Sequence, residues 1–160
     1  MCGVYSTARV GVPLVVVNVH GSCTNNEKST LWNEIADIKR NQSCTLWGIM
    51  GDFNAMRKVE ERKGIGISSG NYREMELFNN FIEQCEVFDI PMIGGKYRFR
   101  PNGGAKSRID RVLVSEDWLE RWPNTKQYIM VREVSDHCAI VVKEKVLDWG
   151  LKPFKLFDVW

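Results

Sequence analysis

Residues 45–64, TLWGIMGDFNAMRKVEERKG, join an apolar run to a polar and charged segment. The run over residues 44–50 is typical of a strand that is buried on both faces. It leads into residues 51–54, GDFN, which place a carboxylate and a carboxamide two residues apart. Asp and Asn are also common in turns, where their side chains bond to the nearby backbone. The stretch therefore predicts a buried strand followed by polar groups that are either structural or functional.

The composition is that of a globular protein. Of 160 residues, 44% are hydrophobic and 26% are charged, and the net charge is +2. We expect one domain or a large piece of one. The longest apolar stretch, residues 14–17, is far too short to span a membrane, so no membrane partner is expected. Five cysteines without a C-x-x-C pair predict reduced thiols in an intracellular protein, with neither a zinc site nor a disulfide-linked partner.

The other segments alternate predicted strands and helices, without repeats or low-complexity linkers, which favours a single α/β unit. Helices are predicted from Thr24 or Asn25 to about residue 41, from about Asn71 to Glu86, and from Ser115 through Trp122. Further strands are predicted near residues 13–19, 96–100, 108–114, 127–132 and 138–144. The polar, glycine-rich residues between 55 and 71 read as a surface loop.

Two more stretches join an acid to an apolar strand: SRIDRVLV at 107–114 and SDHCAIVV at 135–142. In the first, Asp110 shares its strand face with apolar side chains, so its carboxylate needs a partner to offset the loss of water. In the second, Asp136 and His137 stand at the mouth of a strand that is apolar on both faces. A neighbouring arginine could pair with Asp110, and His137 could be a structural histidine, so each stretch alone has two interpretations.

Together the three stretches predict one cluster. Asp52 and Asn54 follow the end of one strand, whereas Asp110, Asp136 and His137 stand where others begin. Antiparallel neighbours would bring all five residues to the same rim of a sheet. Such a rim suits phosphodiester hydrolysis, because a carboxylate can activate water, an amide can bond a phosphate oxygen, and a histidine held by a carboxylate can carry positive charge. Carboxylates that meet a phosphate also predict Mg²⁺, with Mn²⁺ as the alternative.

Positive charge is concentrated in residues 96–111, which hold six cations and one acid. Aromatic residues alternate with these cations, so the segment could contact phosphates and stack on bases. The alternative is a solvated edge strand whose charges prevent aggregation. The residues predicted to bind nucleic acid are Lys96, Tyr97, Arg98, Arg100, Lys106 and Arg108.

With GDFN, SRID before a strand and SDH before the last strand, in this order, the chain resembles the endonuclease/exonuclease/phosphatase superfamily. The resemblance covers residues 13–145. More narrowly, the chain is similar to the endonuclease region of plant non-LTR retrotransposons, as supported by Asn18-Val19-His20, the run EERKG at 60–64, SRIDR at 107–111 and the tail DWGLKPF at 148–154.

The resemblance implies a four-layered α/β sandwich: two packed, mostly antiparallel sheets flanked by helices, incomplete at the N-terminus. Residues 1–145 would be the partial nuclease domain. Residues 146–160 would begin a linker toward a missing reverse transcriptase region. The partner would be DNA, with the nucleus as a candidate compartment, and the basic segment would be a hairpin that lies against the DNA.

Residue roles carry over in the same way. Asp52 matches the acid that orients or deprotonates the attacking water, and Asn54 matches the amide that steadies the phosphate. Asp110 matches the acid hydrogen-bonded to the catalytic histidine, His137. Asp136 matches the acid close to the metal.

Two departures from the family pattern affect the expected activity. His20 stands where the family usually places a tyrosine that helps to position the phosphate. No counterpart of the principal metal-binding glutamate lies upstream of Val12, and the strand at 13–19 is expected to have an exposed edge. We therefore expect a metal-dependent DNA endonuclease that is weak or inactive as this chain. The alternatives are a non-catalytic retrotransposon remnant with residual nucleic-acid binding and an inositol or lipid phosphatase of the same superfamily.

Overall fold

The computed structural model describes residues 2–6, 12–63, 72–93, 98–99, 106–129 and 140–144. Its centre is a five-stranded sheet with the order β1-β2-β3-β9-β5. These strands are β1 (Cys2–Ser6), β2 (Val15–His20), β3 (Trp47–Asp52), β9 (Asp110–Ser115) and β5 (Val87–Asp89). Only the β2–β3 pair in this sheet is parallel. The mostly antiparallel arrangement predicted from the sequence is confirmed for this sheet.

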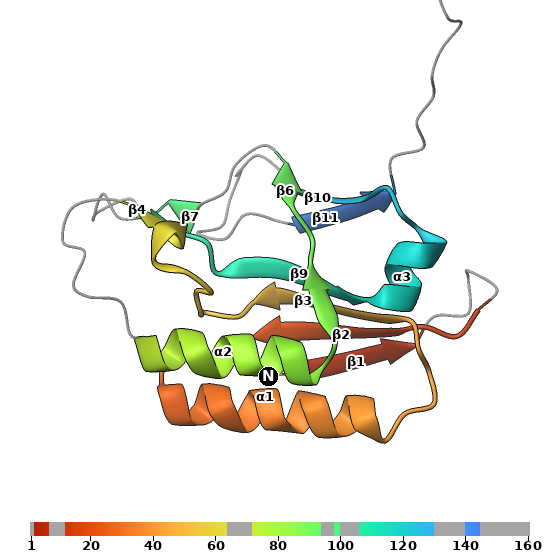
Figure 1. Ribbon diagram of the computed structural model, residues 1–160, viewed down its shortest axis with the longest axis horizontal. Coiled ribbons are helices and arrows are strands. Elements are labelled where there is room, and N and C mark those ends of the chain that lie inside the picture. The colour runs from red at the N-terminus through yellow and green to blue at the C-terminus, as the bar shows by residue number, and fades with distance from the viewer. Residues whose placement is uncertain are drawn as a thin grey trace, which may run out of the picture.

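Two smaller sheets complete the strands among the described residues. One has the order β11-β10-β6, and its strands are β11 (Ile140–Glu144), β10 (Thr125–Ile129) and β6 (Met92–Ile93). The other has the order β4-β8-β7, with β4 (Arg62–Lys63), β8 (Lys106–Ser107) and β7 (Arg98–Phe99). The first of these small sheets lies across the five-stranded sheet on the side away from the two long helices (Figure 1).

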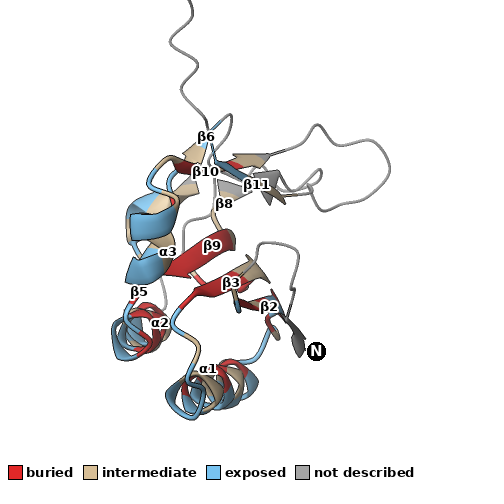
Figure 2. Ribbon diagram, turned by 90° about the vertical axis from the view of Figure 1, so that its right-hand side faces the viewer, coloured by how far each residue is buried: buried red, intermediate tan, exposed pale blue. Residues whose placement is uncertain are grey.

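The helices form where the apolar spacing predicts them. They are α1 (Asn25–Arg40), α2 (Tyr72–Gln84) and α3 (Glu116–Arg121), with a short 3-10 turn η1 (Val59–Glu61). The long helices α1 and α2 lie side by side against one face of the five-stranded sheet, and both turn their buried residues toward it (Figure 2). A helix layer, a large sheet and a small sheet therefore follow one another, as an α/β sandwich requires.

The two faces of the large sheet have separate cores. On the helix side, Trp32, Phe53, Phe78 and Phe81 are buried together, and the Phe53 and Phe78 ring centroids lie 5.3 Å apart. On the other side, Val112 and Val114 of β9 pack with side chains that include Ile140 and Val142 of β11. This second core joins the two sheets, as expected for packed sheets.

The sequence prediction missed several strands. β5 and β6 have only three and two residues, too few for a visible apolar pattern. β1 pairs antiparallel with β2 along its whole length, from Cys2 opposite Val19 to Ser6 opposite Val15. The exposed edge expected for the strand at 13–19 is therefore wrong, because β1 covers it.

Within the described ranges, no helix combines the length and the apolar character that a membrane crossing needs. Cys23 is exposed, Cys44 is half-buried and Cys85 is buried, and all three are free thiols. Burial raises the pKa of the Cys85 thiol to about 11, and Lys39 and Arg40 oppose this rise only partly.

Gly51 provides a test of how closely β2 and β3 approach. Its φ of +134° is unfavourable for residues with a side chain, and a Cβ at this position would overlap the backbone carbonyl of Val19. We expect Gly51→Ala to lower the free energy of unfolding by about 2 kcal/mol or more, measured by urea denaturation. Gly48→Ala on the same strand is the control, since its Cβ would mainly meet the movable Trp118 and Met50 side chains. An equal effect of the two substitutions would contradict this account.

Candidate active site

Three polar residues form a row across neighbouring strands. His20 of β2 is in register with Asp52 of β3, and Asp52 is directly opposite Asp110 of β9. Side chains of paired residues project from the same face of a sheet. The Asp52 side chain is buried, Asp110 is half-buried and His20 is exposed. The predicted meeting of Asp52 and Asp110 at one rim is thus present in the strand register.

The alternation of side chains along β3 explains the GDFN sequence. Phe53 is fully buried in the helix-side core. Asp52, one residue earlier, therefore faces the opposite side of the sheet. The turn interpretation also has support, because the Asp52 Oδ1 accepts a hydrogen bond from the Asn54 backbone N–H at 2.8 Å. One motif thus anchors the core, shapes the turn and supplies a carboxylate.

Asn54 is held on several sides. Its φ of +50° lies in the left-handed region, which Asn tolerates better than most residues. Its side-chain Nδ2 donates to the Ser22 carbonyl at 3.2 Å and to the Cys23 Sγ at 3.3 Å. Its own carbonyl accepts a hydrogen bond from the Lys28 Nζ at 2.6 Å. The carboxamide is therefore fixed beside the loop that follows β2.

Backbone hydrogen bonds tie the ends of the three strands together. The Gly21 N–H donates to the Asp52 carbonyl at 2.6 Å, and the Phe53 N–H donates to the Ile109 carbonyl at 2.9 Å. A side chain at Gly21 would overlap the Phe53 carbonyl, so the two loops approach as closely as backbone permits. These bonds fix the relative positions of His20, Asp52 and Asp110.

A buried ionic cluster lies on the helix side of β9. The Arg111 side chain is completely buried, and its Nη1 donates to the Asp89 Oδ2 at 2.7 Å. Arg111 also forms an ion pair with Glu61. Arg108 donates to the Asp89 Oδ1 at 2.6 Å. Buried charges need such partners, because an unpaired one would cost several kcal/mol. The cluster joins η1, β5 and β9.

The acid Glu61 shows two opposing effects on its pKa. Burial raises it, but hydrogen bonds and charge from Arg111, the backbone N–H of Arg57 and the charge of Arg108 lower it. The net result is a pKa below the usual 4.5. Glu61 thus stays ionised beside the two arginines at neutral pH.

The basic segment contributes less free charge than its composition suggests. Arg108 was predicted to bind nucleic acid, but its guanidinium donates to Asp89 and to the Ile90 carbonyl and belongs to the buried cluster. Arg98 and Lys106 lie in strands β7 and β8. Three other residues of the predicted set lie outside the described residues: Lys96, Tyr97 and Arg100.

Asp136 and His137 also lie outside the described residues. Their roles, and the hydrogen bond between Asp110 and His137, stay predictions. The described part of β11 begins at Ile140, on the side of the molecule where β2 and β3 end (Figure 1).

Two carboxylates of the row could contribute ligands to a divalent cation. Asp52 and Asp110 are carboxylates on directly opposed residues, and two like charges in that arrangement favour positive charge or hydrogen-bond donors nearby. Their oxygens are the kind of ligand that Mg²⁺ takes. In the part of the chain that the structure describes, no group of three or more His, Cys, Asp or Glu residues could hold a metal ion. The described residues thus offer the kind of ligand that Mg²⁺ takes, but they do not include a complete set of ligands.

Sequence reasoning missed Lys28 and Glu74. Lys28 is 3% exposed on α1, and its Nζ lies 2.5 Å from the Glu74 Oε1 on α2. A signal was present, since Lys28 stands one turn before Trp32 on the apolar stripe of the helix. A lysine on a stripe that faces the core must reach a buried partner or extend to solvent.

Several solved structures share this fold. One is an endonuclease/exonuclease/phosphatase family protein from Leptotrichia buccalis, with a TM-score of 0.53 and 19% identity over 90% of this chain and 52% of that chain. Another is the endonuclease domain of TRAS1, a telomere-specific non-LTR retrotransposon, with a TM-score of 0.65 and 14% identity over 92% of this chain and 64% of that chain. No family model and no curated protein matches the sequence.

Two further structures show the range of this fold. The 3′ phosphatase NExo from Neisseria, bound to a product DNA hairpin, has a TM-score of 0.59 and 16% identity over 82% of this chain and 61% of that chain. A beta toxin mutant from Staphylococcus aureus with bound magnesium ions has a TM-score of 0.52 and 13% identity over 86% and 51%. The present chain thus spans less than two thirds of each structure, and identities this low establish the fold alone.

Arg111→Met tests the buried cluster. Removal of the guanidinium leaves the carboxylates of Glu61 and Asp89, whose side chains are 15% and 6% exposed, without their most buried partner, so we expect the free energy of unfolding at pH 7 to fall by about 3 kcal/mol. Arg40→Met is the control, because Arg40 pairs with Asp37 on the surface and should contribute less than about 1 kcal/mol.

The loss of stability caused by Arg111→Met should depend on pH. The folded-state pKa of Glu61 lies below 4.5, so its stabilisation is present above that pH and is lost as pH falls through the lower, folded-state value. The difference between wild type and Arg111→Met should therefore shrink in acid. Chemical denaturation at several pH values between 7 and 3 measures this, and a constant difference would show that Glu61 is not the partner.

Proposed function

We propose that this chain is part of a metal-dependent phosphodiesterase that hydrolyses DNA, of retrotransposon origin. The observation that carries the proposal is the register that sets His20, Asp52 and Asp110 in one row on adjacent strands. Carboxylates and an imidazole at one edge of a sheet suit the activation of water beside a phosphate. An enzyme that acts on DNA would work inside the cell, with the nucleus as the candidate compartment.

The residues of the row have separate tasks in this proposal. Asp52 orients the attacking water and accepts its proton. Asp110 holds His137 by a hydrogen bond, and His137 meets the phosphate with positive charge. His20, the exposed member, donates a hydrogen bond to the phosphate. A bound Mg²⁺ near Asp52, Asp110 and Asp136 would neutralise charge on the phosphate.

Asn54 would steady a non-bridging phosphate oxygen. Its two Nδ2 hydrogens now bond to the Ser22 carbonyl and the Cys23 Sγ. Sulfur is a weak acceptor, whereas a charged phosphate oxygen is a strong one. The bond to Cys23 is therefore the one that a phosphate would replace, and the bond to Ser22 would keep the carboxamide oriented.

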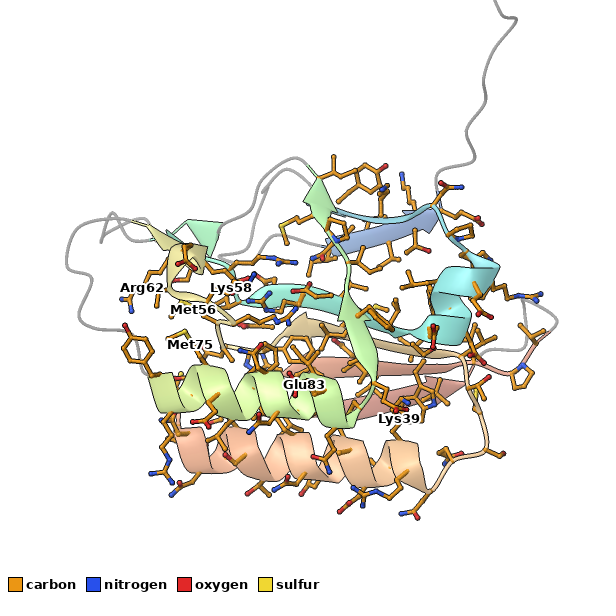
Figure 3. All side chains as sticks on the ribbon, in the orientation of Figure 1. Lys39, Met56, Lys58, Arg62, Met75 and Glu83 are labelled. Atoms are coloured by element: carbon orange, nitrogen blue, oxygen red, sulfur yellow. The ribbon has the colours of Figure 1, made fainter. Side chains whose placement is uncertain are left out.

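DNA as the partner is supported by the remaining basic residues. Lys96, Arg98, Arg100 and Lys106 remain candidates for phosphate contacts and Tyr97 for stacking on a base, whereas Arg108 is withdrawn from the proposed set because its guanidinium pairs with Asp89. Lys58 is exposed near η1, on the side where β3 ends (Figure 3). The structures of a retrotransposon endonuclease and of a DNA-bound 3′ phosphatase add support from fold likeness.

A second candidate function is a non-catalytic remnant that retains weak nucleic-acid binding. It is supported by the departure at His20, which stands where the resembled family usually places a tyrosine. In this case the row of polar residues would persist without turnover.

Nicking of supercoiled plasmid with Mg²⁺ separates the two candidates. We expect Asp52→Ala and Asp110→Ala to lower the nicking rate by about 100-fold or more, because the first removes the acceptor of the water proton and the second removes the proposed partner of His137. Asp37→Ala, at an exposed acid of α1, should leave the rate unchanged. Equal rates in all four proteins would rule out this site, and absence of nicking in wild type would favour the remnant.

DNA binding can be tested apart from catalysis. The double variant Arg98→Glu and Arg100→Glu should lower affinity and reduce the slope of log K against log salt by about 0.9 for each lost phosphate contact. The double variant Arg40→Glu and Arg121→Glu, at the exposed ends of α1 and α3, is the charge-matched control. Fluorescence anisotropy with a labelled duplex at several salt concentrations gives the slopes. An unchanged slope in the double variant would exclude these arginines from the interface.

A further inference from the structure

Lys28 is an unusual buried residue. It is 3% exposed, although lysine is rarely buried and its ammonium group loses much hydration energy away from water. It lies on the core-facing side of α1 with Trp32 and Ile35. A buried ammonium persists only where it is paired and hydrogen-bonded, so its contacts indicate what it does.

Those contacts bridge three segments. The Lys28 Nζ donates to the Asn54 backbone carbonyl at 2.6 Å and lies 2.5 Å from the Glu74 Oε1. Glu74 belongs to the first turn of α2, and its side chain is 19% exposed. One ammonium thus joins α1, α2 and the loop after β3.

The conformation of the loop at Asn54 depends on contacts from several segments. Its φ of +50° lies in the left-handed region, where Asn is one of the few non-glycine residues found regularly and where surrounding contacts hold it in place. The Asn54 N–H bonds to Asp52, its carboxamide bonds to the Ser22 carbonyl, and its carbonyl bonds to Lys28. The contact with Lys28 is the one that comes from the helix layer.

We propose that Lys28 is a positioning residue for phosphodiester hydrolysis. Its ammonium group, held by Glu74, fixes the Asn54 backbone so that the Asn54 carboxamide and the Asp52 carboxylate keep their relative orientation. This inference rests on the proposed function of the site. Lys28 acts through Asn54 and does not touch the reacting atoms, so it should affect turnover more than DNA affinity.

The experiment compares Lys28→Met with Lys39→Met in the full 160-residue chain. Both substitutions remove one lysine from α1 and keep an unbranched apolar stem. Lys39 lies over the Trp47 ring. In Figure 3, Lys39 lies near one end of the two long helices, whereas Met56, which follows Asn54 by two residues, lies near their other end. Lys28→Arg retains the charge and tests whether a conservative replacement restores function.

Two readouts are measured on each variant. The first is the plasmid nicking rate as a function of DNA concentration, which separates kcat from KM. The second is the ¹⁵N–¹H NMR spectrum, in which Asn54→Asp identifies the side-chain amide signals of Asn54. The second readout needs no activity.

We expect Lys28→Met to lower kcat about 10- to 100-fold with KM changed less than about threefold, because a misplaced group loses turnover rather than binding. The Asn54 signals should shift in Lys28→Met, shift less in Lys28→Arg and stay in place in Lys39→Met. Unmoved Asn54 signals with a kcat equal to that of Lys39→Met would overturn the inference while the proposed function stands.

Other outcomes remain informative. If wild type does not nick DNA but the Asn54 signals move in Lys28→Met, the proposed function fails and the positioning contact is supported. If Lys28→Met does not fold, Lys28→Arg and Glu74→Gln are measured by the same readouts. Asn54 signals unmoved in both folded variants would then overturn the inference.

Discussion

The antiparallel register of β3 with β9 is the constraint on which the site depends. It sets Asp52 directly opposite Asp110, and the parallel register of β2 with β3 adds His20 to the same row. Because side chains alternate along a strand, a shift of β3 by one residue would turn Asp52 to the helix side and break the row. That shift would also take Phe53 out of the aromatic core. The same register of β3 therefore buries Phe53 in the aromatic core and places Asp52 in the polar row.

Two charged residues that are adjacent in β9, Asp110 and Arg111, have different roles. On one face of β9, Asp110 contributes to the row of polar residues. On the other face, Arg111 is buried between Glu61 and Asp89 and fixes η1 and β5 against the strand. Adjacent residues of one strand thus belong to a site and to a structural cluster. Buried ion pairs add little net stability but are costly to break, so the cluster limits how η1 and β5 can be arranged against β9.

Much of this was predictable from local patterns. The apolar run before GDFN predicted a buried strand, and the acids beside strand ends predicted a shared rim, of which the register shows the part formed by Asp52 and Asp110. What failed depended on distant partners. Arg108 looked like a surface cation because nothing near it in the chain reveals Asp89, and β1 was missed because the edge it covers is defined only in three dimensions. Lys28 was missed because its partners belong to two other segments.

The β2, α1 and β3 segments follow one another directly, and the two strands pair in parallel. The loop between β2 and β3 is shorter than the one between β3 and β9, so this pair can assemble first, with His20 and Asp52 already in register. β9 is supplied from much further along the chain and must close a long loop before it pairs. During synthesis, Asp52 would therefore remain without the strand that carries Asp110 until residues 110–115 have been made.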